Sequence, residues 1–515
     1  MLKISMNADD FSVLQATYAL HEIEIITLRE RVLTLEEEIA RLKEKLALQQ
    51  KNQFDKKSEV SKTDPLEENS SSVHTVAAHQ RTRKPRGNRF DTSELPRHTV
   101  IHDLSETQRH CACCQEALHK IGEEVSEQVE IIPTRYCVIE HVRLKYGCRQ
   151  CDTIVMADKP PAPIPKAAAG ASLLADILIG KYHAHLPLYR QSKLMRDHQL
   201  AIPDNTLGNW VMQSGEGLMP LYDALWAILK SPYLQVDETP VKVLKTNKKG
   251  YIWTYYARLM KLVVFEFSET RAGKVAEERL RNFIGLLQTD GYAGYKKLHK
   301  RTTIIGLGCI THARRKFADI IKISNDKQGI AAEMIERLKP IYALEARLKD
   351  GNATFHTRKR LRQKIAYPIL KEIKRWLCQQ RPQIPPKSKL GDAITYFFNQ
   401  WPYLIAYTRH GTAEIDTNGV ERKIREIALG RRNWLFIGNK NSGKVHALFY
   451  SLVLSCVLNT INPRVYLHYV LTKVHELRRG EIDPRTLLPD KIDCTILQKF
   501  SDEQIEFAKK MMNHP

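Results

Sequence analysis

The spacing of hydrophobic positions divides the 515-residue chain into a helical start, a stretch without pattern and a long mixed region. Residues 25–46 carry a heptad repeat, with Ile25, Val32, Ile39 and Leu46 at position a and Leu28, Leu35 and Leu42 at position d. β-Branched residues at a with leucine at d favour two parallel strands. We therefore predict a leucine-zipper dimer within residues 1–50, and the alternative is a single amphipathic helix packed on its own domain.

Periodicity disappears from residue 51 to residue 98, where Ser, Lys and Glu predominate and the segment ends in QRTRKPRGNR. This composition predicts a flexible linker. Its basic arm, which includes Arg83, Lys84 and Arg86, could lie along DNA phosphates. It could equally be a solvated tether, and both readings stay open.

Two Cys-x-x-Cys pairs mark the next module, residues 99–165. They flank two stretches of alternating polarity, VSEQVEI and YCVIEHVRLKY, which a Pro-containing turn joins. Two thiolate pairs at the ends of a β-hairpin are typical of a closed structural zinc site. The predicted ligands of one Zn²⁺ are Cys111, Cys114, Cys148 and Cys151. Cys113 could replace Cys114, His110 and His141 are lesser substitutes, and buried free thiols are the alternative.

A proline-rich hinge, KPPAPIPK, leads into helical patterning across residues 166–230. One helical stretch ends at AIPD and a second begins with NTLGNW, with Asp204 placed to cap it. Two helices joined by a short turn can put the second one into the major groove of DNA. In that arrangement Asn205, Thr206 and Asn209 face the bases, although many helix pairs have no such role.

Strand and helix patterns are mixed from residue 231 to residue 475, which predicts a multidomain α/β protein with its main sheet here. Strands are expected at VKVL, YIWTYYARL, KLVVFEF, GLLQTD, TTIIGLGCI and NWLFIG, and helices at RAGKVAEERLRNF, THARRKFADIIK and HALFYSLVLSCVLNT. A basic helical stretch, about 331–410, looks inserted into this domain. Residues 476–515 form a C-terminal segment whose part beyond about 490 has no assigned role.

Three carboxylates stand out in this region. Asp237 and Asp290 end short apolar runs, and Glu421 lies on an amphipathic helix. Hard cations prefer oxygen ligands and need open positions for a substrate, so this set predicts two Mg²⁺ or Mn²⁺ ions held against a phosphodiester. Asp416 is a rival of Glu421, but the helix can direct Glu421 back toward the strand ends. Each acid alone would more often be a structural or solubility residue.

Two further motifs lie beside these acids. His312, Arg314 and Arg315 follow the strand that ends at Ile310, and we predict them next to the metal site, where cations would offset phosphate charge. A solvated basic helix face is the alternative. The run GNKNSGK, residues 438–444, nearly spells a phosphate-binding loop, but Val445 stands where that motif needs Ser or Thr for Mg²⁺. We interpret the run as a turn.

The net charge of the chain indicates the class of molecule that it binds. Lys and Arg number 80 against 58 Asp and Glu, a net charge of +22, and the pI is about 9.4. An excess of this size predicts a polyanion as partner, because each neutralised phosphate releases counterions. The longest apolar run, residues 447–458, is far shorter than the roughly 20 residues of a membrane span, and no signal peptide is recognisable. These features predict a cytoplasmic, nucleoid-associated protein without a membrane partner.

Several motifs together resemble one known family, the DDE transposases of the insertion-sequence-66 type, over roughly residues 85–490. They are GCRQCDTIVMADKPPAPIPKAAAG, KYHAHLPLYRQSKLM, VDETPVKVL, QTDGYAGYKKL, GCITHARRKFAD and IDTNGVERKIREIALGRRNWLFIGNKNSG. The resemblance implies that Asp237, Asp290 and Glu421 are the DDE residues of a ribonuclease-H-like core, preceded by a zinc-binding domain and a leucine zipper. Thr417 and Ile310 replace an asparagine and a tryptophan of the family pattern.

The expected function is therefore that of a bacterial DNA transposase that binds the ends of a mobile element, cleaves them and joins them to target DNA. We expect a homodimer or higher oligomer, with element-encoded accessory proteins as possible partners. A DNA-binding regulator derived from such an enzyme is a second candidate, against which the presence of all three acids argues. A structure-selective nuclease is a third, and it would have no need of the zipper, the zinc module and the helix pair.

Overall fold

The computed structural model describes residue 38 and residues 136–512, except for 148–153, 157, 159, 166, 230 and 325–327. The chain divides into two compact units, residues 1–53 with 135–515 and residues 54–134, and the described residues all belong to the first. Apart from residue 38, the predicted zipper, the linker and the four zinc-binding cysteines lie outside the described residues. In the zinc module, β1 (Lys145–Gly147) pairs antiparallel with β2 (Ile154–Met156).

The main sheet has five strands in the order β5-β4-β3-β6-β7. They are β3 (Tyr233–Lys242), β4 (Lys249–Ala257), β5 (Leu262–Ser268), β6 (Gly285–Gln288) and β7 (Ile304–Leu307). The first three are antiparallel to one another, and β6 and β7 run parallel to β3. A five-stranded mixed sheet covered by helices is typical of a ribonuclease-H-like DDE domain, as the sequence predicted.

Two predicted strands are different in the structure. VKVL is no separate strand, because β3 continues through Val241 to Lys242. NWLFIG is no strand either, since α12 (Asn418–Trp434) runs on to Trp434 and only Ile437 makes an isolated bridge, to Val243. Short apolar runs do not distinguish a strand from the end of a helix, which is why the pattern misled there.

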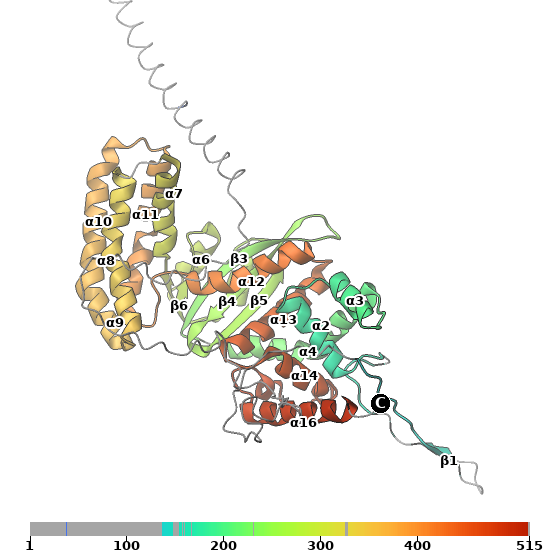
Figure 1. Ribbon diagram of the computed structural model, residues 1–515. Coiled ribbons are helices and arrows are strands. Elements are labelled where there is room, and N and C mark those ends of the chain that lie inside the picture. Colours follow the sequence, from blue (N-terminus) through green and yellow to red (C-terminus); the bar gives the residue numbers. More distant parts are fainter. Residues whose placement is uncertain are drawn as a thin grey trace, which may run out of the picture. The chain divides into compact units, whose positions relative to one another are not determined.

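Helices from distant parts of the sequence cover the sheet (Figure 1). The helix α12 packs on β3 and β4, and α13 (Lys440–Leu458) packs on β5. Behind α13 lie α4 (Asp204–Ile228), α2 (Ala171–Tyr182) and α14 (Pro463–Thr472), followed by α3 (Leu188–Asp197). A single hydrophobic core includes residues from Ile164 to Leu497, so the helical segment 166–230 and the C-terminal segment share the core of the sheet.

Two details of these outer helices complete the comparison. Asp204 is the first residue of α4 rather than its cap, and its carboxylate accepts only from the Asn205 amide, at 3.0 Å. The last helix, α16 (Cys494–Met512), packs on α14 and buries Leu497, which gives the residues beyond 490 a structural role. Within the described part of the chain, no helix is long and apolar enough to span a membrane.

A second hydrophobic core lies in the region of the predicted helical insertion. It is formed by α7 (Ile310–Ser324), α8 (Ile330–Asp350), α9 (Phe355–Leu361), α10 (Tyr367–Gln380) and α11 (Lys389–Ala406). The helices form a bundle beside the sheet, where α11 contacts the edge strand β7 (Figure 1). The bundle lies in sequence between the second acid and the third.

One buried arginine fastens this bundle to the chain that leads into α12. Arg362 is fully buried, and its Nε and Nη2 donate to Glu345 at 2.7 and 2.6 Å. Its Nη1 donates to the carbonyl oxygens of His410 and Ala413 at 2.9 and 2.8 Å. A buried charge of this kind is tolerable because its donors are paired. Arg362 therefore fixes residues 410–413, a few residues before the third acid.

Candidate active site

Asp237 and Asp290 come just after the point where two parallel strands stop pairing. The last paired residues are Gln235 and Gln288, each two residues before an aspartate, and among the neighbouring charges Asp290 acts most strongly on Asp237. Asp290 follows the end of β6 as predicted, whereas Asp237 lies inside β3, at the point where β6 stops. Backbone amides hold both carboxylates: Glu238 N donates to Asp237 and Tyr292 N to Asp290, each at 2.8 Å.

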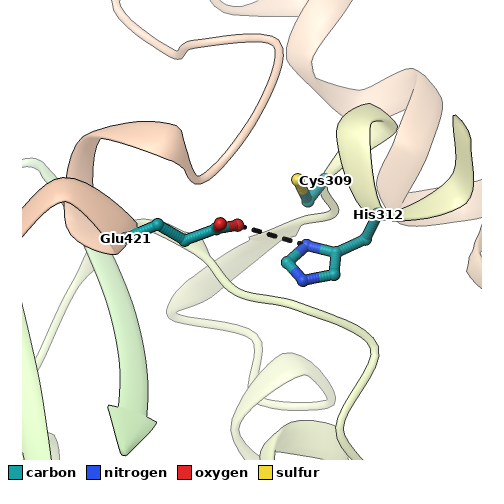
Figure 2. Close-up of side chains that lie close together, drawn as sticks. All are labelled: Cys309, His312 and Glu421. Atoms are coloured by element: carbon teal, nitrogen blue, oxygen red, sulfur yellow. Dashed lines mark ion pairs between the residues drawn. The ribbon is translucent and has the colours of Figure 1, made fainter. Parts of the chain in front are cut away.

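Glu421 occupies the first turn of α12 and faces the start of α7 (Figure 2). Its carboxylate accepts from Arg315 Nη2 at 3.3 Å and from the Thr417 hydroxyl at 3.3 Å. His312 Nδ1 lies 3.7 Å from it. The structure thus brings His312 and Arg315 close to Glu421.

Arg314 has a different neighbour. Its guanidinium lies over the ring of Tyr342 on α8, 5.8 Å from the ring centroid. Adjacent residues on a helix point in directions about 100° apart, so Arg314 cannot share the orientation of Arg315. Arg314 therefore has Tyr342 as its described neighbour, and its predicted role beside the acids stays a prediction.

The electrostatics of Asp237 are unusual for an aspartate. Burial and, after it, the nearby carboxylates of Asp290, Glu238 and Glu421 raise its pKa to about 8, against the lowering effect of the Glu238 amide. The surrounding carboxylates thus disfavour the ionised form of Asp237. A divalent cation would favour that form, and three carboxylates are the oxygen ligands that Mg²⁺ prefers, so these residues fit the implied metal.

This pKa has a consequence for stability without added Mg²⁺. A carboxyl group whose pKa is higher in the folded protein stabilises the fold when protonated. The contribution of Asp237 is complete below its ordinary value of 3.8 and is lost as pH rises through about 8. We expect Asp237→Asn, which cannot ionise, to gain stability over the wild type between pH 5 and 8, by at most about 1.4 kcal/mol per pH unit. Urea denaturation at several pH values measures this gain, and a gain that does not change with pH would contradict the assignment.

Glu238 is a buried acid that the sequence analysis missed. Arg271 Nε donates to it at 2.7 Å, and the Tyr295 hydroxyl also donates to it. Burial is the main cause of its raised pKa, while these two hydrogen bonds act in the opposite direction. Because alternate residues of a strand point to opposite faces, Glu238 lies on the face of β3 away from Asp237. The only sequence signal that could have identified Glu238 was its place directly after Asp237.

A pair of fully buried glutamines joins the elements that carry the acids. Gln235 Nε2 donates to Gln288 Oε1 and to the carbonyl oxygen of Asp416, both at 2.9 Å. Gln235 Oε1 accepts from the Val420 amide at 3.0 Å, in the first turn of α12. Gln288 Nε2 donates to the carbonyl oxygen of Glu414 at 3.0 Å. Each glutamine lies two residues before an aspartate, so the network connects β3, β6 and the start of α12.

Asp416, the rival of Glu421, has its oxygens committed to local structure. It accepts from the Thr311 hydroxyl at 2.9 Å and from Asn418, through the backbone amide at 3.0 Å and the side-chain amide at 2.7 Å. These contacts hold the turn that begins α12. Asp416 therefore has a structural role, which favours Glu421 as the third acid.

A second set of possible ligands overlaps the site. Among the described residues, one group of three His, Cys, Asp or Glu side chains brings its ligand atoms within 4.8 Å of one another, and it consists of Cys309, His312 and Glu421 (Figure 2). Burial raises the pKa of the Cys309 thiol to about 11, and its sulfur accepts from the Thr417 amide at 3.3 Å. A protonated thiol is a poor ligand for Mg²⁺. This trio offers less to a hard cation than the three carboxylates do.

The other predicted site residues are separate from the acids. Asn205 and Asn209 are exposed and Thr206 is partly exposed, at the start of α4. One face of α4 is buried in the main core, while Gln213, Glu216, Asp223 and Ala227 of its later turns are exposed like its start. Arg83, Lys84 and Arg86 lie outside the described residues, as do Cys111, Cys114, Cys148 and Cys151.

Comparison with known proteins gives two family matches. A model described as "Transposase IS66 family" matches residues 166–445, and one described as "zinc-finger binding domain of transposase IS66" matches residues 108–152. The uncharacterized protein y4jD of Sinorhizobium fredii (strain NBRC 101917 / NGR234) is 33% identical over 419 residues, covering 78% of this chain and 81% of that protein. The uncharacterized protein y4hP of the same strain is 29% identical over 436 residues, covering 80% of this chain and 78% of that protein.

Proposed function

Because the chain belongs to the IS66 family of DDE transposases, we propose that Asp237, Asp290 and Glu421 cleave the ends of a mobile element and join them to target DNA. The observation that carries this proposal is the strand register, which ends two residues before each aspartate and so directs both toward the same end of the sheet. The raised pKa of Asp237 adds support, because carboxylates gathered to bind cations disfavour one another's ionised form when no cation is bound.

Two divalent ions bound by these carboxylates would activate the attacking water or 3′ hydroxyl and stabilise the leaving oxygen. The residues of the chain prepare that step. Asp237, Asp290 and Glu421 would hold the ions through their carboxylate oxygens, and a bound cation would favour the ionised form of Asp237. Arg315, which donates to Glu421 at 3.3 Å, would lie within reach of a phosphate oxygen beside them. Arg315 acts here as a phosphate-contacting group.

His312 would serve as a neutral neighbour of Glu421. Burial lowers its pKa, and although Glu421 acts in the opposite direction, Arg315 lowers it again. A neutral imidazole adds no charge that would compete with the cation for Glu421. We propose that His312 positions the Glu421 carboxylate rather than transferring a proton.

The zinc-finger domain at residues 108–152 implies one structural zinc. We propose Cys111, Cys114, Cys148 and Cys151 as its four ligands, because closed structural sites use four thiolates in two short-spaced pairs. The zipper at residues 25–46 would pair two chains. Arg83, Lys84, Arg86 and the exposed start of α4 would contact DNA. The protein would act in the bacterial cytoplasm.

The test uses the DNA that flanks the gene. A supercoiled plasmid carrying those flanks, incubated with full-length protein and Mg²⁺, is expected to be cut at the element boundaries and joined to a second plasmid. Primer extension maps the cuts, and sequencing identifies the joined products. Binding without cutting in both Mg²⁺ and Mn²⁺ would instead indicate a regulator, and cutting without joining would indicate a nuclease.

A further inference from the structure

The hairpin between β3 and β4 is locked to the segment that joins α12 to α13. Three backbone hydrogen bonds connect them: Ile437 N donates to Lys242 O at 2.8 Å, Leu244 N to Ile437 O at 2.8 Å, and Lys245 N to Gly438 O at 3.0 Å. Arg431 Nη1 adds a bond to Pro240 O at 2.6 Å. Residues 242–249 and 431–444 therefore form one rigid surface feature, which we name the basic ridge.

Seven exposed cations occupy the basic ridge. The hairpin contributes Lys242, Lys245, Lys248 and Lys249, and the second segment contributes Arg432, Lys440 and Lys444. Residues 239–252 and 427–446 contain no Asp or Glu. Within the described residues, none of the seven makes an ion pair with a carboxylate. This surface thus carries positive charge that the fold does not use.

One pair of these lysines even works against folding. Lys242 and Lys249 stand directly opposite each other in the register of β3 and β4. Like charges at opposite positions of an antiparallel pair destabilise the sheet. An anion from another molecule that lies across both lysines would offset this repulsion.

The basic ridge also exposes three large apolar side chains, which we call the apolar tip. Leu435 is 63% exposed, Leu244 53% and Phe436 39%. The backbone at Leu435 has φ 66° and ψ −42°, and Phe436 N donates to Trp434 O at 2.8 Å. This is a γ-turn of the rarer, strained form, centred on a residue other than glycine. The strained turn holds the Leu435 side chain in solvent. Burial of that side chain therefore does not compensate for the strain within the chain itself.

The basic ridge lies along β3 from the acids. Lys242 is five residues beyond Asp237, a distance of roughly 16 Å along the strand. Duplex DNA rises about 3.4 Å per base pair, so that distance corresponds to about five base pairs. By strand alternation Lys242 leaves β3 on the face away from Asp237, so a duplex with one phosphate at the acids reaches the basic ridge where it passes over the end of the β3–β4 hairpin.

We propose that the basic ridge binds duplex DNA next to the cleaved phosphate, with its cations on backbone phosphates and its apolar tip in the minor groove. Proteins that bind the minor groove combine cations with Leu or Phe wedges in this way. The proposal rests on the proposed function, because it takes DNA as the substrate. It also gives a role to GNKNSGK: Asn439 and Ser442 form the capping box of α13, and the two lysines of that run face solvent.

The first experiment measures the phosphate contacts. Full-length protein without added divalent metal is titrated into a fluorescent 30-base-pair duplex of arbitrary sequence at NaCl concentrations from 50 to 300 mM. Each phosphate contact contributes about 0.9 to the slope of log affinity against log salt. We expect Lys245→Gln, Lys248→Gln and Lys440→Gln together to reduce the slope by about 2 to 3. The matched control is Lys499→Gln, Lys509→Gln and Lys510→Gln on α16, which should keep the wild-type slope.

The second experiment measures the apolar tip. Leu435→Gly combined with Phe436→Ala is expected to weaken binding about tenfold while the salt slope stays that of the wild type. Glycine suits the positive φ at position 435, so the variant should remain folded, and its thermal unfolding midpoint checks this. The control is Ile505→Ala with Phe507→Ala on α16, two side chains of similar exposure that lie away from the basic ridge.

Any one of three results would overturn the proposal. These are a wild-type salt slope in the triple-lysine variant, wild-type affinity in the Leu435→Gly, Phe436→Ala variant, and equal losses in the matched controls. These results are distinguishable from a failure of the proposed function, because the proposed function is tested by cleavage and the basic ridge by binding. Asp237→Asn should bind this duplex like the wild type, whatever its effect on cleavage.

Discussion

Replacing Asp237 by Asn, Asp290 by Asn or Glu421 by Gln is expected to lower DNA cleavage by about a thousandfold or more, while affinity for DNA stays close to that of the wild type. Each change removes an anionic oxygen from a metal site that needs several of them, and several kcal/mol of transition-state stabilisation disappear with it. Phosphate contacts lie elsewhere on the protein, so binding persists. Cleavage of the plasmid that carries the flanking DNA gives the cleavage rate. Fluorescence anisotropy with the same protein samples gives the affinity for DNA.

The control for this series is Asp416→Asn. Asp416 is an acid five residues from Glu421, but its oxygens accept from Thr311 and Asn418 and hold a turn. We expect this variant to lose some stability and to retain most of its cleavage per folded molecule. A mutant of any of the three acids that cuts nearly as fast as the wild type would refute the assignment, as would a complete loss confined to Asp416→Asn.

The second large effect is expected at Gln235, which never reaches the substrate. Gln235→Ala should lower the free energy of unfolding by about 3 kcal/mol, because it leaves buried hydrogen-bonding groups without partners. It should also slow cleavage at least about tenfold at a temperature where the protein is fully folded. The reason is geometric: Gln235 binds Gln288 and the Val420 amide, and so aligns β3, β6 and the helix of Glu421.

A matched glutamine separates alignment from stability. Gln191 is also buried, and its amide donates to the carbonyl oxygens of Ile177 and Leu186 in the outer helices. Gln191→Ala should destabilise the protein without slowing cleavage per folded molecule. Denaturation curves and single-turnover cleavage rates measure the two effects. If Gln235→Ala and Gln191→Ala were equal in both measurements, the glutamine network would be only structural.

The three candidate acids could be selected from the sequence because strand ends and helix faces leave a pattern. Asp290 ends a run of apolar residues, and Glu421 occupies a defined position on an amphipathic helix. The bundle between them was also predictable, since its apolar residues recur with helical spacing over long segments. Both kinds of signal are local, and they depend only on which residues lie within a few positions of one another.

The glutamine network left no such signal. Gln235 lies 53 residues from Gln288 and 185 residues from Val420, and its burial depends on both. A polar residue inside a strand normally indicates a solvent-facing position, yet helices cover β3 here and bury the amide. The contact of Arg314 with Tyr342 left no signal for a related reason, because the sequence predicts a helix but not how the helix is rotated relative to its neighbours.

The anchoring of Arg362 sets a limit on how small such an enzyme can become. All three acids lie outside the bundle of α7 to α11, in β3, just after β6 and in α12, so the sequence alone suggests that the bundle is dispensable. Yet Arg362, from inside that bundle, holds the carbonyl oxygens of His410 and Ala413 just ahead of α12. A shortened version lacking the bundle would keep every acid and lose this anchor. Evolution and protein engineering alike must therefore replace the anchor before they can remove the bundle.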